Sequence, residues 1–213
     1  TDVALVGGET AEMPDTYLKN EHDLVGVITG VVERNKIITG ERIQSGDIII
    51  GLPSSGLHTN GYSLARKVFF DIGGYHVNDN ISGLEKSVGL TLLEPHTNYT
   101  RHVFSILNSN IFIKGIAHIT GGGLLENIPR ILPEGLGVAI EKKSWPLLPV
   151  FSCLQSIGDI EDTEMFRTFN MGIGMIMVLD KKSVQSVTKI LRKYCKPYEI
   201  GQVVSGNKTV ELS

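Results

Sequence analysis

The sequence predicts an α+β fold in which helices are layered on a mixed sheet. Three observations support this class. Several short β-branched runs have the length of buried strands, other segments carry apolar residues at helical spacing, and the two kinds mix without the strict alternation that a parallel sheet needs. The 213 residues are 41% hydrophobic and 20% charged, which is typical of a globular chain and not of a disordered one.

The first predicted elements lie in residues 24–71. A buried strand is expected over residues 24–32 (LVGVITGVV) and another over residues 48–52 (IIIGL), because both runs are short, apolar and β-branched. Asn60 is the expected N-cap of a helix over residues 61–71, whose apolar side chains recur on one face.

The rest of the chain continues to mix the two kinds of element. Helices are expected over residues 99–107, 124–132, 149–156 and 181–194, and strands over residues 116–119, 137–140, 172–179, 198–204 and 209–212. A polar, glycine-containing stretch near residue 45 marks a domain boundary. Residues 1–45 are therefore expected to be the remnant of a first domain, and residues 46–213 a complete second domain. The start of the chain, which lacks Met and runs at once into strand-like residues, also suggests a fragment.

Composition excludes several functional classes. With 20 basic and 23 acidic residues the net charge is −3, which gives no electrostatic footprint for nucleic acid or for an anionic membrane. The two cysteines, Cys153 and Cys195, are too few for a disulfide framework or a cysteine-based zinc site. No run approaches the ~18 apolar residues of a membrane span, and no signal peptide opens the chain. We expect a cytoplasmic protein.

Glycine concentrates in four short polar turns at the ends of predicted strands. They are residues 7–12 (GGETAE), 54–61 (SSGLHTNG), 118–123 (HITGGG) and 167–172 (RTFNMG). Glycine lets the backbone approach a ligand closely, and N–H groups at a helix start attract phosphate. One such cluster is more often a simple tight turn, and none matches a known nucleotide fingerprint. Four of them together favour a phosphate-bearing ligand.

The polar residues of these turns each allow two interpretations. His58 either caps the following helix or donates a hydrogen bond to a phosphate or amide oxygen. His118 is either a satisfied core histidine or a site residue. Glu9 and Glu12 either cap the next element or contact Mg²⁺ or a nucleotide, since hard cations prefer carboxylates. Arg167 either forms a surface ion pair or, beside Asn170, clamps a phosphate.

These turns, in this order and spacing, resemble the phosphoribosylformylglycinamidine cyclo-ligase (AIR synthetase) family. The resemblance rests on residues 4–14 (ALVGGETAEMP), 46–64 (GDIIIGLPSSGLHTNGYSL), 116–133 (IAHITGGGLLENIPRILP) and 165–175 (MFRTFNMGIGM), and it extends over essentially the whole chain. It implies a layered α/β/α domain with a mixed sheet, preceded by a remnant of the N-terminal ATP-binding domain.

The resemblance also implies an activity. Members of the family convert formylglycinamidine ribonucleotide and ATP into aminoimidazole ribonucleotide, ADP and phosphate, the fifth step of purine biosynthesis. ATP and Mg²⁺ are the implied cofactors, a ribonucleotide is the implied substrate, and the full-length protein is expected to be a homodimer. The fragment alone is expected to be inactive. Two alternatives stay open: a sister enzyme of the formylglycinamidine ribonucleotide synthetase or selenophosphate synthetase type, and a non-catalytic nucleotide-binding module.

Site residues carried over from the resemblance fall into four groups. They are the catalytic His58 and Asn60; the substrate- or phosphate-binding Ser63, Thr120, Gly121, Gly122, Gly123, Arg167 and Asn170; the ATP-binding Gly8, Glu9, Thr10 and Glu12; and the metal ligands Glu9 and His118. One segment departs from the family. Where the family often has Pro-Thr-x-x-Tyr, residues 95–99 of this chain are Pro-His-Thr-Asn-Tyr, which puts a substrate role for the segment in doubt.

Overall fold

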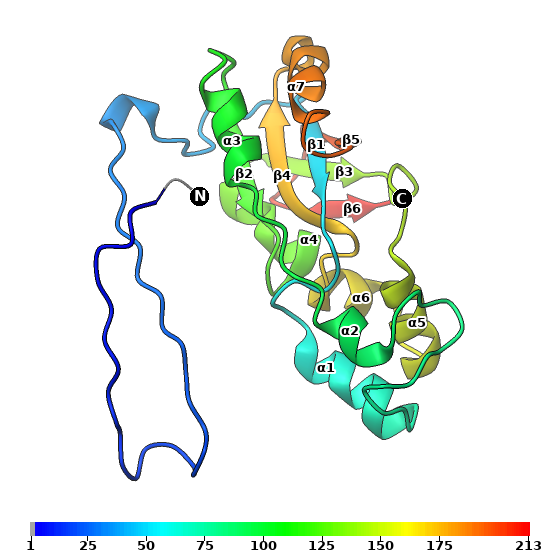
Figure 1. Ribbon diagram of the computed structural model, residues 1–213. Coiled ribbons are helices and arrows are strands. Elements are labelled where there is room, and N and C mark those ends of the chain that lie inside the picture. Colours follow the sequence, from blue (N-terminus) through cyan, green and yellow to red (C-terminus); the bar gives the residue numbers. More distant parts are fainter. Residues whose placement is uncertain (1–2) are drawn as a thin grey trace. The chain divides into compact units, whose positions relative to one another are not determined.

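The computed structural model describes residues 3–213 of the chain (Figure 1). It divides into two units, one ending at Ile37 and the other spanning Ile38–Ser213. All six strands and all seven α-helices assigned in the described residues belong to the second unit. None of the helices in residues 3–213 combines the length and the apolar character that a membrane span requires.

The strand predicted over residues 24–32 is absent from the first unit, so this prediction was wrong. Residues 24–32 form no strand and are exposed, with Leu24 97% and Val31 100% accessible. The unit's one helical element is the 3₁₀ turn η1 (Arg34–Lys36). A β-branched run becomes a strand only where another strand satisfies its backbone groups and a packed layer covers its side chains. Within residues 3–37 neither is present, so the composition of the run was not sufficient.

A six-stranded mixed sheet forms the centre of the second unit (Figure 1). The strands are β1 (Ile48–Pro53), β2 (Gly115–His118), β3 (Leu136–Ile140), β4 (Ile173–Leu179), β5 (Tyr198–Ser205) and β6 (Val210–Leu212), in the order β2-β4-β1-β5-β3-β6. The β3–β6 pair is parallel and the other four pairs are antiparallel. The prediction of a mixed sheet is confirmed. Although β5 and β6 follow each other in sequence, β3 lies between them.

Alternation along β1 explains why the fold is layered. Ile48, Ile50 and Leu52 point to one face of the sheet, where they pack with residues of α3 (Thr100–Leu107) and α7 (Val184–Leu191). Ile49 points to the other face and joins the larger core. Side chains of a strand alternate with a period of two, so one apolar run serves both layers.

The larger core is covered by the remaining helices. These include α1 (Tyr62–Arg66), α4 (Gly123–Asn127), α5 (Pro149–Gly158) and α6 (Asp162–Thr168), all of which contribute buried side chains to it. The π-helical segment η2 (Lys67–Ile72) continues α1, the 3₁₀ turn η3 (Pro129–Ile131) follows α4, and the 3₁₀ turn η4 (Lys181–Ser183) precedes α7. The α/β/α layering implied by the resemblance is confirmed.

Two helical details differ from the prediction. The helix after β1 is capped by Gly61, whose φ is 81°, and not by Asn60. Gly61 can adopt this left-handed conformation because it has no Cβ. No helix was predicted over α2 (Val88–Leu92) or α6. Both are too short to show an apolar periodicity of their own.

Candidate functional site

The turn that follows β1 is held in place by the side chain of Asn170. Its Nδ2 donates to the carbonyls of Gly56 (2.8 Å) and Leu57 (3.1 Å), while its Oδ1 accepts from Ser54 Oγ (2.7 Å) and from the Gly172 N–H (2.9 Å). Asn170 is buried and lies just before β4, so the turn is tied to a neighbouring strand of the sheet. Both Oδ1 and Nδ2 of Asn170 are thus hydrogen-bonded within the fold. The predicted contact of Asn170 with a phosphate stays a prediction.

His58 sits inside this turn with its backbone in the left-handed region (φ 61°) and its side chain buried. Its Nε2 accepts from the backbone N–H groups of Ser55 (3.1 Å) and Thr97 (3.4 Å). A ring nitrogen that accepts carries no proton, so the proton is on Nδ1, which is buried without a partner in the described structure. Burial, together with the nearby His96 and His118, lowers the pKa of His58 to about 4, and the ring is neutral at pH 7.

Two further histidines complete what we call the histidine cluster: His58, His96 and His118. The His96 ring stacks on His58, with centroids 3.9 Å apart and planes 16° apart. The Nε2 atoms of His96 and His118 lie 3.1 Å from each other, and one donates to the other. Burial lowers the pKa of both rings. His118 ends β2, while His96 lies in the loop between α2 and α3, so the fold brings together residues 22 positions apart.

Tyr99, at the start of α3, lies beside all three rings of the cluster. Its hydroxyl donates to the carbonyl of Pro53 (2.8 Å), and burial raises its pKa above the ordinary value. A Cβ added to Gly174 would lie 2.1 Å from the Tyr99 Oη and 3.0 Å from the His58 Nδ1. A glycine is therefore required at this position of β4 for both rings to fit.

The glycine turn at residues 120–123 is organised by Asn127, a buried residue of α4. Its Nδ2 lies within hydrogen-bonding distance of the carbonyls of Thr120 (3.3 Å), Gly121 (3.1 Å) and Gly123 (2.8 Å), and its Oδ1 accepts from Thr120 Oγ1 (3.2 Å). Gly122 and Gly123 have φ values of 94° and 55°. The turn is thus a preformed loop at the start of α4, as a backbone cradle for a ligand requires.

Of the two predicted site residues Asn60 and Ser63, only Asn60 lies beside the glycine turn. Asn60 faces the glycine turn, since a Cβ added to Gly121 would lie 3.5 Å from its Oδ1. The turn after β1 and the turn before α4 therefore meet at Asn60. Ser63 is exposed on α1 and lines a separate surface pocket with Arg66 and Asp71. Among the described residues Ser63 forms no hydrogen bond to the histidine cluster, and its predicted role stays a prediction.

Arg167 lies at the end of α6 with its guanidinium half exposed. Its Nε is 3.7 Å from Glu126 Oε1, and its Nη1 is 3.5 Å from Glu164 Oε2. Glu126 belongs to α4, so this ion pair connects Arg167 to the helix that follows the glycine turn. The two acidic partners offset the positive charge that a phosphate clamp would use.

The predicted ATP-binding residues Gly8, Glu9, Thr10 and Glu12 belong to the first unit. All four are exposed there, and no atom lies within 4 Å of a Cβ added to Gly8. Their predicted role in ATP binding stays a prediction.

Metal-ligating side chains converge at one place among residues 3–213, the histidine cluster, where one ring nitrogen of each residue lies within 4.8 Å of the others. Imidazole nitrogens suit zinc, copper and nickel, whereas Mg²⁺ prefers oxygen ligands in octahedral geometry. The surroundings of His118 therefore do not fit the Mg²⁺ site that the resemblance implies.

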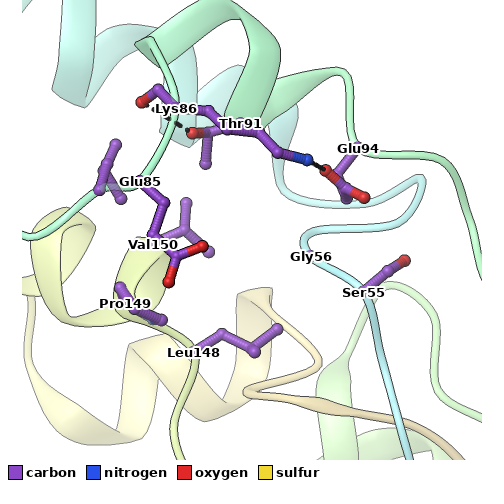
Figure 2. Close-up of a pocket in the computed structure, with 10 residues that line it drawn as sticks. Ser55, Gly56, Glu85, Lys86, Thr91, Glu94, Leu148, Pro149 and Val150 are labelled. Atoms are coloured by element: carbon purple, nitrogen blue, oxygen red, sulfur yellow. Dashed lines mark hydrogen bonds and ion pairs between the residues drawn. The ribbon is translucent and has the colours of Figure 1, made fainter. Parts of the chain in front are cut away.

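A cavity of about 300 Å³ shares Ser55 and Gly56 with the turn after β1. Figure 2 shows Glu85, Lys86 and Glu94 along its wall, with an ion pair joining Lys86 to Glu94. Ser55 Oγ donates to the carbonyl of Pro95 (2.6 Å) and so links this cavity to the segment that carries His96.

Sequence reasoning missed several residues that build the site. The departure at residues 95–99 includes His96, but nothing in the sequence indicated that this ring stacks on His58. Asn127 lies four to seven residues beyond the turn it organises, and a single Asn on a short helix gives no signal in the sequence. The need for glycine at Gly174 depends on two rings from distant segments, which only the fold brings together.

Comparison with known families gives one match to a family description. The family described as "AIR synthase related protein, C-terminal domain" matches residues 44–212. Among curated proteins, a phosphoribosylformylglycinamidine cyclo-ligase of Geotalea daltonii is 54% identical over 86% of this chain and 53% of its own length. A cyclo-ligase of Pseudothermotoga lettingae is 50% identical over 97% of this chain and 60% of its own length. One of Geobacillus thermodenitrificans is 47% identical over 95% of this chain and 59% of its own length. The chain thus spans somewhat over half the length of these relatives.

Solved structures resemble the fold at much lower identity. A thiamine-monophosphate kinase from Stenotrophomonas maltophilia aligns with a TM-score of 0.56 and 16% identity, over 85% of this chain and 54% of that one. The hydrogenase maturation protein HypE in complex with ATP aligns with a TM-score of 0.54 and 18% identity, over 81% of this chain and 49% of that one. At such identities the likeness establishes the fold only.

Proposed function

The chain belongs to the AIR synthase related protein family, and from this we propose that it forms the substrate-binding part of a phosphoribosylformylglycinamidine cyclo-ligase. The observation that carries the proposal is the identity of 45–54% to proteins of that name over most of the chain. The same motifs that support the likeness, the turn after β1 and the glycine turn, meet at Asn60 in the structure.

The proposed reaction closes an imidazole ring at the expense of ATP. ATP phosphorylates the formyl amide oxygen of formylglycinamidine ribonucleotide, which turns a poor leaving group into a good one. The amidine nitrogen then attacks the same carbon, and phosphate leaves to give aminoimidazole ribonucleotide. The protein contributes positioning and stabilisation of phosphoryl charge; correct orientation alone supplies up to roughly 7–11 kcal/mol in such reactions.

The contacts around His58 support a positioning role for this residue. Its Nε2 is engaged by two backbone N–H groups and its Nδ1 is buried, so neither nitrogen is free toward a ligand. A base with a pKa of about 4 is also poorly matched to proton transfer near pH 7. We assign His58 to holding Ser55 and Thr97 in place, and Asn60 with the glycine turn to contacting the ribonucleotide.

Several further features of the whole enzyme belong to the same proposal. ATP and Mg²⁺ would be bound through the first unit, where Gly8, Glu9, Thr10 and Glu12 lie. Because these residues are exposed and form no assembled site in the described first unit, we propose that the 213-residue chain alone has no cyclo-ligase turnover. The complete enzyme would be a cytoplasmic homodimer.

Calorimetric titration of the 213-residue chain tests the proposal. We expect formylglycinamidine ribonucleotide to bind without ATP, and Asn60→Ala to weaken binding at least tenfold, which is about 1.4 kcal/mol. Asn78→Ala is the matched control, because Asn78 is exposed and lies in a loop remote in sequence from both turns. Absence of ribonucleotide binding, with ATP and Mg²⁺ absent or present, would contradict a substrate site in residues 38–213.

A further inference from the structure

Two histidines that the proposed reaction does not use already have the separation of two ligands on one metal ion. The Nε2 atoms of His96 and His118 lie 3.1 Å apart, and their rings are inclined at 49°. Two nitrogens bound at 2.0–2.1 Å to a tetrahedral ion are separated by about 3.3 Å. The pair therefore already has nearly the nitrogen spacing that one ion needs, and the ion would lie beside the line joining the two nitrogens once the rings turn toward it.

His58 has a different place in this arrangement. Its ring is nearly parallel to that of His96, and two stacked rings cannot both direct an in-plane lone pair at one ion. The Nε2 lone pair of His58 is also occupied by the backbone N–H groups of Ser55 and Thr97. His58 is thus a positioning residue that supports the flat face of His96.

The surroundings of the pair decide which ions suit it. The converging group contains imidazoles and no carboxylate among the described residues, so it favours borderline transition metals over Mg²⁺ or Ca²⁺. His118 is exposed and His96 is partly exposed, which leaves room for water or another oxygen ligand on the ion. A catalytic type of site keeps such open positions, whereas a structural zinc site is closed by four protein ligands.

We propose that His96 and His118 form a two-histidine site for a divalent transition-metal ion of the Zn²⁺, Ni²⁺ or Cu²⁺ class, with its remaining positions open to solvent. Without metal, one Nε2–H donates to the other Nε2. When the ion binds, that proton moves to Nδ1 of the same ring, both Nε2 lone pairs point at the ion, and no net proton is released. The site does not depend on the proposed cyclo-ligase function.

The test uses the 213-residue protein, freed of metal with a chelator and titrated with Zn²⁺ and separately with Ni²⁺ in a non-chelating buffer at pH 7.5. We expect one ion per chain. We expect His96→Thr and His118→Asn each to weaken binding at least tenfold. His22→Asn and His76→Thr are the controls, since both histidines are exposed and lie outside the cluster, and they should bind within twofold of the parent.

X-ray absorption spectroscopy at the zinc K edge identifies the ligands of the bound ion in the parent protein. It therefore tests the proposal even if a cluster variant fails to fold. The parent protein should show backscattering from imidazole, and this signal should persist in the His22→Asn variant. Three results would overturn the proposal: affinity unchanged in folded His96→Thr, affinity that depends on His22 or His76, or bound zinc without imidazole backscattering.

Discussion

At the scale of single residues, the histidine cluster shows how burial selects a protonation state. His58, His96 and His118 all have lowered pKa values, and burial is the largest cause for each. A charged imidazolium would lose water on entering the fold, and any two protonated rings of the cluster would repel each other. The cluster is therefore stable as three neutral rings, the form in which His58 accepts from two backbone N–H groups.

This arrangement predicts that the protein loses stability in mild acid. The folded-state pKa of His58 is about 4, below the unfolded value of 6.5, so between these values the unfolded chain binds more protons. The stabilising contribution is present above pH 6.5 and is lost as the pH falls toward 4. We expect the unfolding equilibrium constant to rise roughly tenfold or more between pH 7 and pH 5.

Urea denaturation at a series of pH values measures this effect. In His58→Gln the change between pH 7 and pH 5 should be smaller, because Gln does not titrate. A pH dependence of the same size in the parent and the variant would show that other groups cause it.

Asn170 provides a second prediction at the residue scale. Replacement with Ala would leave the Ser54 hydroxyl, two carbonyls and the Gly172 N–H without their buried partner. We expect Asn170→Ala to lower the free energy of unfolding by about 3 kcal/mol, since each unsatisfied buried group is costly. Asn78→Ala, at an exposed position, should change it by less than about 0.5 kcal/mol in the same urea titration. Equal losses in the two variants would show that the Asn170 amide does not fix the turn.

At the scale of elements, the strands were easier to predict than the helices. The runs that became β1 and β4 are β-branched and continuous, and they were placed to within about a residue. The short helices α2 and α6 were missed because five and seven residues contain too few turns to show a pattern. The run at residues 24–32 is apolar and β-branched like β1 but lacks a paired strand in residues 3–37, so composition alone gave the wrong answer there.

Two glycines with positive φ, Gly123 and Gly74, allow the cost of backbone strain to be separated from the cost of steric overlap. Gly123 has a φ of 55°, and a Cβ there would lie 1.9 Å from the backbone oxygen of Phe166. Gly74 also has a positive φ (66°), but a Cβ there would meet no atom within 4 Å. Gly74→Ala should therefore cost only the left-handed strain, about 1–2 kcal/mol.

Gly123→Ala should cost more, about 4 kcal/mol, because α4 and α6 must also move apart. Urea denaturation of both variants gives the comparison. Losses of similar size would mean that the turn relaxes around the added methyl group and is not held as tightly as its Asn127 hydrogen bonds indicate.

At the scale of the whole molecule, the sequence predicted the fold class, the layers and the identity of the turns, but not how the turns converge. Local patterns determine strands and glycine-rich turns. The stacking of His96 on His58 and the fit of Gly174 beneath two rings depend on strand order and on loops far apart in sequence. The glycine-rich turns were therefore predictable from the sequence, whereas the contributions of His96, Asn127 and Gly174 and the geometry of the site were not.

The division into two units gives a prediction about the chain as a whole. Residues 3–37 are exposed and carry few backbone hydrogen bonds, whereas residues 38–213 enclose two hydrophobic clusters and a six-stranded sheet. Proteases cleave segments that open at little cost in free energy. We expect brief trypsin treatment to cut first after Lys19, Arg34 or Lys36, and to leave a resistant product that begins near Ile37.

Mass spectrometry of the early fragments identifies these first cuts. The basic residues of the second unit provide an internal control, because Lys86, Lys142 and Lys208 are held in ion pairs within the folded unit. Cleavage after them should be at least tenfold slower. First cuts at these three lysines would mean that the second unit opens more readily than its core indicates. The separated product should keep the pH dependence described above, since the histidine cluster lies wholly within residues 38–213.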